Sequence, residues 1–189
     1  PDWSRGLGDV YKRQLLTLGF EILSSNQLKL SNKNKNTLIS LISKCTGHLG
    51  VAGGQFLDLN YEKKKISKSK IIDMQRKKTG MLFQFCCLAP VILSEKTKYY
   101  KKFEKLGLDI GLLFQIADDI IDYKGNSKNA GKKTQKDKKK GKATLISLLG
   151  YQNTIKYSVV TKNKIFNKLS EFGKKANDLK ETLNYVLLR

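Results

Sequence analysis

From residue 15 onward, apolar residues recur at steps of three and four, and this spacing constrains the fold more than any other feature of the chain. It is the period of one face of an α-helix, whereas a half-buried β-strand alternates strictly. The chain has two prolines, and only Pro90 lies within this region, so little interrupts the helical pattern. The sequence therefore predicts an all-α protein built as a bundle of antiparallel helices.

Several apolar stripes mark the expected helices. One stripe covers residues 38–42 after a polar start. A second helix extends over residues 71–85, and Pro90 is expected to kink or end it. A third, longer helix covers residues 99–121, and two more helices are expected within residues 154–188.

The first 14 residues differ from the rest of the chain. They hold the single Trp and two closely spaced glycines, and they show no helical apolar period. They resemble a translated adaptor sequence, so we interpret residues 1–14 as a non-native leader, neither a signal peptide nor part of the core. The expected domain covers residues 15–189, and its first helix is already under way at Leu15.

The charge of the chain is strongly positive, with 37 Lys+Arg against 16 Asp+Glu and a formal net charge of +21. Positive charge favours phosphate binding, so a basic helical module that binds nucleic acid or anionic lipid is one hypothesis. Lysine far outnumbers arginine, however, and aromatic residues are not interleaved with the basic runs. We therefore do not expect nucleic acid to be the partner.

Membrane insertion and disulfide bonding are also not expected. The longest apolar run, residues 81–93, contains Gln84 and Pro90, and a spanning helix needs about 20 apolar residues. The three cysteines show no C-x-x-C spacing, which argues against a disulfide framework or a structural zinc site. These features favour a cytoplasmic protein.

An acidic cluster occurs within this basic chain, where Asp118, Asp119 and Asp122 follow a nearly apolar stretch of the third expected helix. Asp118 and Asp122 project from the same face one turn apart, and Asp119 is rotated by about 100°. Stacked carboxylates repel each other, so we expect a compensating cation. Mg²⁺ suits this role, since it prefers one or two carboxylates, several waters and phosphate oxygens. The alternative is a solvated helix end whose acids pair with neighbouring lysines.

The segment from residue 124 to residue 142 breaks the helical pattern and predicts a long, charged loop. Lys132 and Lys142 each follow a glycine there, and Asp137 lies between them. A lysine-lined loop after a carboxylate-bearing helix suits a diphosphate that Mg²⁺ bridges to the carboxylates, because ammonium groups neutralise the remaining charge.

Together these motifs resemble the trans-isoprenyl diphosphate synthases of the farnesyl and geranylgeranyl type, over roughly residue 15 to the C-terminus. The resemblance rests on several segments that occur in the family's order. They are Gly53-Gly54-Gln55-Phe56-Leu57-Asp58-Leu59, Lys78-Thr79-Gly80, Phe114-Gln115-Ile116-Ala117-Asp118-Asp119-Ile120-Ile121-Asp122, Gly131-Lys132 and Gly141-Lys142-Ala143-Thr144-Leu145.

The resemblance implies a role for each matching residue. Asp118, Asp119 and Asp122 resemble the second aspartate-rich motif, which binds the allylic diphosphate through Mg²⁺, with Asp118 as the first choice of direct ligand and Asp137 joining through water. The remaining matches form three groups: Lys78, Lys132 and Lys142 as diphosphate contacts, Thr79 and Gln115 (with the Lys78 carbonyl) beside the allylic carbon, and Gln55 and Asp58 as supporting residues on the facing helix.

The implied reaction is Mg²⁺-dependent, head-to-tail transfer of a prenyl group from an allylic diphosphate to isopentenyl diphosphate. We expect a short-chain enzyme of the farnesyl type, with the isoprenoid synthase fold and a homodimeric assembly. A longer-chain synthase, a homologue without activity and the basic binding module remain as alternatives. The chain has no match to the family's first aspartate-rich motif, so we interpret it as a C-terminal portion that lacks the N-terminal helices, and expect it to be inactive alone.

Overall fold

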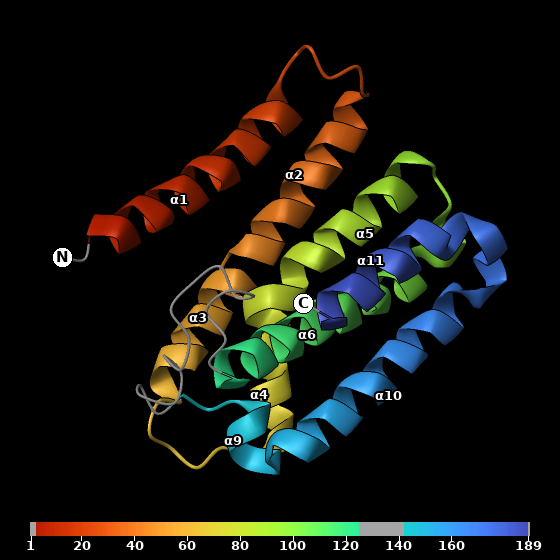
Figure 1. Ribbon diagram of the computed structural model, residues 1–189. Coiled ribbons are helices and arrows are strands. Elements are labelled where there is room, and N and C mark those ends of the chain that lie inside the picture. The colour runs from red at the N-terminus through yellow and green to blue at the C-terminus, as the bar shows by residue number, and fades with distance from the viewer. Residues whose placement is uncertain (1–2, 125–141, 189) are drawn as a thin grey trace. The chain divides into compact units, whose positions relative to one another are not determined.

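The computed structural model describes residues 3–124 and 142–188 of the chain (Figure 1). Within these ranges the secondary structure is helical and no strand occurs, which confirms the prediction of an all-α protein. The expected loop from residue 124 to residue 142, with Lys132 and Asp137, lies almost entirely outside the described residues. The chain divides into two compact units, Pro1–Lys44 and Cys45–Arg189.

The first unit contains α1 (Trp3–Ser24) and most of α2 (Asn32–Thr46). The apolar stripe at residues 38–42 lies in α2 as predicted, and Leu38 and Ile42 are buried. The absence of a helical pattern in residues 1–14 was misleading, since α1 begins at Trp3. Residues 10–14 are exposed, and an established helix extends at one hydrogen bond per added residue without needing a buried face.

The second unit holds the other helices. Its first half consists of α3 (Val51–Asn60), α4 (Lys68–Gln75), a π-helical turn η1 (Arg76–Gly80) and α5 (Met81–Leu93). Pro90 lies inside α5, which ends three residues later. The position of Pro90 in the last turn explains why the helix is not broken earlier, because few backbone hydrogen bonds remain to be lost there.

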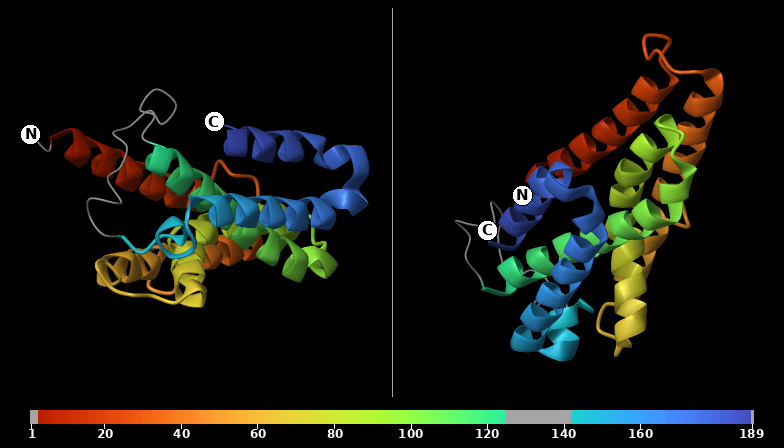
Figure 2. Two further views of the ribbon diagram at one scale, coloured as in Figure 1. Left: turned by 60° about the horizontal axis from the view of Figure 1, so that its bottom comes forward. Right: turned by 90° about the vertical axis from the view of Figure 1, so that its right-hand side faces the viewer.

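The second half of this unit begins with a 3₁₀ turn, η2 (Thr97–Tyr99), and the long helix α6 (Tyr100–Lys124). The short α9 (Leu145–Leu149) precedes α10 (Tyr151–Leu169), which leads through η3 (Ser170–Ala176) into α11 (Asn177–Leu188). The two helices that were expected within residues 154–188 are therefore α10 and α11. Figure 2 shows α5 and α10 on either side of α6.

The core of the second unit is organised around α6, which buries two different faces. One face joins α10 and α11 through a cluster of apolar side chains: Leu106, Ile110, Leu113, Ile165, Leu169 and Leu183. The other face joins α4 and α9 through Ile71, Leu112, Ile116, Ala143 and Leu145. Because both faces are occupied, the orientation of α6 about its own axis is determined, and with it the directions of its acidic side chains.

Two glycines allow the π turn to lie against its neighbours. A Cβ atom at Gly54 would collide with the backbone of Lys77 and Lys78, and one at Gly111 would collide with the backbone of Gly80. Only glycine permits such close backbone approach. In consequence, η1 is held directly between α3 and α6.

In the part of the chain that the structure describes, no helix is both long enough and apolar enough to cross a membrane.

Candidate functional site

The site begins at η1, the π-helical turn of residues Arg76–Gly80 that joins α4 to α5. The apolar pattern predicted one continuous helix here, and the π turn is not visible in that pattern. A π turn closes i→i+5 hydrogen bonds and accommodates an extra residue, and such turns occur frequently at functional sites. This one carries Lys78 and Thr79, the two residues of the segment that were predicted to contact substrate.

Lys78 forms an ion pair with Asp58 of α3. The Lys78 Nζ atom donates to Asp58 Oδ2 over 2.6 Å, and the Asp58 side chain is buried. A buried carboxylate requires a paired cation and hydrogen bonds to offset its lost hydration. Asp58, predicted as a supporting residue, therefore orients the ammonium group of Lys78.

Thr79, Gln115 and Asp119 form a directed chain of hydrogen bonds. The Thr79 hydroxyl donates to Gln115 Oε1 over 2.9 Å, and Gln115 Nε2 donates to Asp119 Oδ1 over 2.9 Å. The second oxygen, Asp119 Oδ2, accepts from Gln75 Nε2 over 3.0 Å. Hydrogen bonds to an ionised carboxylate are the stronger kind. The two amides therefore hold the Asp119 carboxylate in one orientation.

All of these side chains except that of Thr79 line a small pocket, to which α3, α4, η1, α6 and the segment before α9 contribute. Its lining comprises Asp58, Met74, Gln75, Lys78, Gln115, Asp119, Lys142, Ala143 and Thr144. Ala143 is buried in the core. Thr144 begins α9 with a capping box, in which it accepts from the Ser147 amide and the Ser147 hydroxyl accepts from the Thr144 amide. These two anchors place Lys142 at the pocket.

The three acids of the cluster are not equivalent. Asp119, with 5% of its surface exposed, lines the pocket, while Asp122 is also buried and Asp118 is half-buried. The family resemblance makes Asp118 the first choice of direct ligand, and this stays a prediction. The packing of α6 turns Asp119 toward Gln75. Gln55, the other supporting residue, is exposed on α3.

Gln75 was missed at the sequence level. It lies three residues before Lys78, a spacing that places two helical residues on neighbouring positions of one face. That spacing was the available signal, but nothing in the sequence connects Gln75 to Asp119, which follows it by 44 positions. Only the packing of α4 against α6 brings these two side chains together.

The donor set of the pocket fits a magnesium–diphosphate group. Within residues 3–124 and 142–188, no group of three His, Cys, Asp or Glu side chains is placed to hold a metal alone. Mg²⁺ does not require one, since it keeps waters and takes substrate phosphate oxygens. The buried Gln75 Oε1 atom has no hydrogen-bond partner, and a water on a bound ion would supply the donor that it lacks.

A family model described as polyprenyl synthetase matches residues 13–186, and the chain belongs to this family. The match covers the motifs on which the sequence prediction depended, and the prediction of the family is therefore confirmed.

Among similar proteins, the farnesyl diphosphate synthase of Micrococcus luteus is 29% identical over 93% of this chain and 60% of its own length. That of Haemophilus influenzae is 34% identical over 72% of this chain and 47% of its own length. The crystal structure of a geranyltransferase from Helicobacter pylori, complexed with magnesium and isoprenyl diphosphate, aligns with a TM-score of 0.77 and 29% identity over 90% of this chain and 56% of that one. The chain thus spans about 60% of the length of the Micrococcus relative.

Proposed function

We propose that this chain forms the allylic diphosphate site of a prenyltransferase that condenses isopentenyl diphosphate with an allylic diphosphate. The observation that carries the proposal is the common pocket of Asp119, Lys78 and Lys142, which belong to three separate segments of the chain. A carboxylate together with two lysines matches a metal-bridged diphosphate rather than a bare phosphate, because a carboxylate repels a bare anion.

The proposed residues have different roles when the allylic substrate ionises. As the bond from the allylic carbon to oxygen breaks, its electron pair stays on the diphosphate, and Lys78 and Lys142 neutralise the growing negative charge. Asp119, helped by Asp118 and Asp122, would hold Mg²⁺, which supplies further charge stabilisation to the leaving group. As the family resemblance implies, the oxygens of Thr79 and Gln115, with the Lys78 carbonyl, would stabilise the allylic cation.

The double bond of isopentenyl diphosphate then attacks the cation, and diphosphate accepts the proton that is lost. No nucleophilic side chain is required.

We propose a product of the farnesyl type, because farnesyl diphosphate synthase is the name carried by both relatives above. Lys132 is a further proposed contact to the diphosphate, and Asp137 is proposed to join the metal site through water. We also propose that the protein assembles as a homodimer. A cytoplasmic location fits the cysteines, which are thiols rather than disulfide partners.

Isothermal titration calorimetry tests the proposal on the full chain. The probe is inorganic diphosphate, titrated with and without MgCl₂. We expect binding that requires Mg²⁺ and that weakens by at least about tenfold in Asp119→Asn, while Asp178→Asn, an exposed position on α11, binds like wild type. Equal binding without Mg²⁺, or an unaffected Asp119→Asn variant that still binds duplex DNA, would contradict the proposal and favour a basic binding module.

A further inference from the structure

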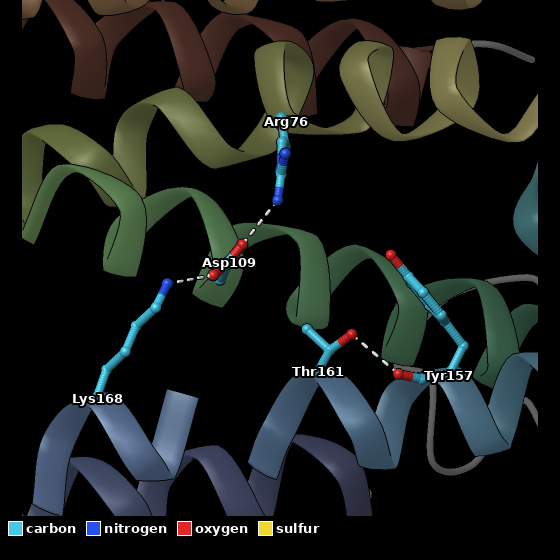
Figure 3. Close-up of polar contacts among 5 residues, drawn as sticks. All are labelled: Arg76, Asp109, Tyr157, Thr161 and Lys168. Atoms are coloured by element: carbon cyan, nitrogen blue, oxygen red, sulfur yellow. Dashed lines mark hydrogen bonds and ion pairs between the residues drawn. The ribbon is translucent and has the colours of Figure 1, made fainter. Parts of the chain in front are cut away.

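A partly buried carboxylate on α6 joins two cations from different elements. The Arg76 Nη2 atom donates to Asp109 Oδ1 over 2.8 Å, and Lys168 Nζ of α10 donates to Asp109 Oδ2 over 2.6 Å (Figure 3). The Asp109 side chain is only 14% exposed. None of these three residues was singled out by the sequence, and none lines the pocket described above.

Arg76 is the first residue of η1, the turn that carries Lys78 and Thr79. Its Nε atom is buried without a hydrogen-bond partner. The Arg76 side chain as a whole is 42% exposed, and the carboxylate of Asp109 is the anion that its Nη2 atom meets. Loss of that carboxylate would therefore favour movement of Arg76 toward solvent.

The turn is held against α6 along its length. Arg76 pairs with Asp109 at the start of the turn, and Gly80 lies against the backbone of Gly111 at its end. Between these anchors the Thr79 hydroxyl donates to Gln115. A π turn lacks the regular hydrogen-bond ladder of an α-helix, so its shape depends on such tertiary contacts.

We propose that Asp109 is a positioning residue for the diphosphate pocket, and that through Arg76 it holds the π turn so that Lys78 and Thr79 face the ligand. The identity of the ligand in this inference rests on the proposed function. The restraint of the π turn by Asp109 and Arg76 does not. The bond from Asp109 to Lys168 has a different effect, since it ties α6 to α10 and leaves the turn untouched.

Four variants of the full chain separate these effects. Asp109→Asn removes the charge that holds Arg76, and Lys168→Met removes only the tie to α10. Asp73→Asn breaks an ion pair with Lys77 of the same turn, in which Asp73 is 57% exposed, and serves as the matched control. Arg76→Met removes the Arg76–Asp109 ion pair by changing the arginine, and it replaces Asp109→Asn if that variant does not fold.

The first readout is calorimetric titration with inorganic diphosphate and MgCl₂. We expect about tenfold weaker binding for Asp109→Asn and for Arg76→Met, as is typical for residues that orient a ligand-binding group. Lys168→Met and Asp73→Asn are expected to stay within about twofold of wild type. Wild-type affinity in Asp109→Asn, or an equal loss in Lys168→Met, would overturn the inference.

The second readout is hydrogen exchange of the backbone amides of residues 76–80, which requires no ligand. Faster exchange at these amides in Asp109→Asn, but not in Lys168→Met, is the expected result. Unchanged exchange would overturn the inference. If wild type does not bind diphosphate but the exchange result holds, the proposed function fails while the positioning role of Asp109 stands.

Discussion

The Thr79 hydroxyl on the π turn donates a hydrogen bond to the Gln115 Oε1 atom on α6, over 2.9 Å. Because Oε1 accepts from Thr79, the amide nitrogen of Gln115 faces Asp119 and donates to its carboxylate. One side-chain contact therefore determines which way the Gln115 amide points. The Thr79 hydroxyl, the Gln115 amide and the Asp119 carboxylate belong to a single connected network, and we expect its members to be coupled.

The first prediction concerns this coupling. Thr79→Val removes the hydroxyl and is expected to lower the free energy of unfolding by about 1 kcal/mol, as for a typical intramolecular hydrogen bond. In a double-mutant cycle with Gln115→Met, the coupling energy should be about 0.5–1.5 kcal/mol, measured by urea denaturation. Thr182→Val, at an exposed position of α11, is the control and should change stability by less than about 0.5 kcal/mol. Additive effects of the two substitutions would show that the network does not act as one unit.

The second prediction concerns the asymmetry of the Lys78–Asp58 pair, in which the lysine side chain is 25% exposed and the aspartate 7% exposed. Lys78→Met leaves a buried carboxylate without its cation and should cost about 2–3 kcal/mol of stability. Asp58→Asn leaves a lysine that water still reaches, and should cost about 1–2 kcal/mol. Guanidinium denaturation measures the loss of unfolding free energy in each variant. A larger loss in Asp58→Asn than in Lys78→Met would contradict the prediction that the more buried Asp58 depends more on the pair.

The third prediction concerns the close contact at Gly54. Gly54→Ala places a methyl group against the backbone of Lys77 and Lys78, and since a backbone cannot rotate away as a side chain can, we expect a loss of about 2–3 kcal/mol. Gly19→Ala is the matched control, because its methyl group would make only ordinary contact with Ile42. In a helix that substitution should be neutral or stabilise by up to about 1 kcal/mol. Thermal unfolding followed by circular dichroism measures the stability of both variants. Equal changes in stability would contradict the close backbone contact at Gly54.

The fourth prediction concerns thiol reactivity. Burial raises the pKa of the Cys87 thiol to about 11, with a smaller contribution from neighbouring Cys86, because a low-dielectric environment penalises the charged thiolate. Burial also raises the pKa of Cys86, which is nevertheless exposed. Since the thiolate is the reactive form, alkylation by iodoacetamide should speed up as pH rises from 7 to 10, with Cys86 reacting before Cys87. Mass spectrometry of the labelled peptides gives the order, and faster labelling of Cys87 at pH 7 would contradict it.

Much of the fold could be predicted from local pattern. The apolar period placed α6 within a few residues of its observed bounds and predicted the stripe in α2 and two helices within residues 154–188, where α10 and α11 lie. A helix that buries one face must repeat every three or four positions. The apolar period did not reveal two local features. Residues 10–14 of α1 are exposed and so leave no apolar pattern, and η1 lies inside an apolar pattern that continues on both sides of it.

The residue types of the candidate site could be picked out in the sequence, while their arrangement could not. Carboxylates and lysines indicate magnesium and phosphate chemistry whatever their spatial arrangement, and on that ground the sequence predicts the acidic cluster and Lys78 as site residues. The pairing of Gln75 with Asp119, and of Arg76 with Asp109, joins residues far apart in the chain. A helical period carries no information about which face meets which distant helix. Only the packing of α6 on both of its faces decided that Asp119 turns toward the pocket, because burying two apolar clusters at once leaves one rotation of the helix about its axis.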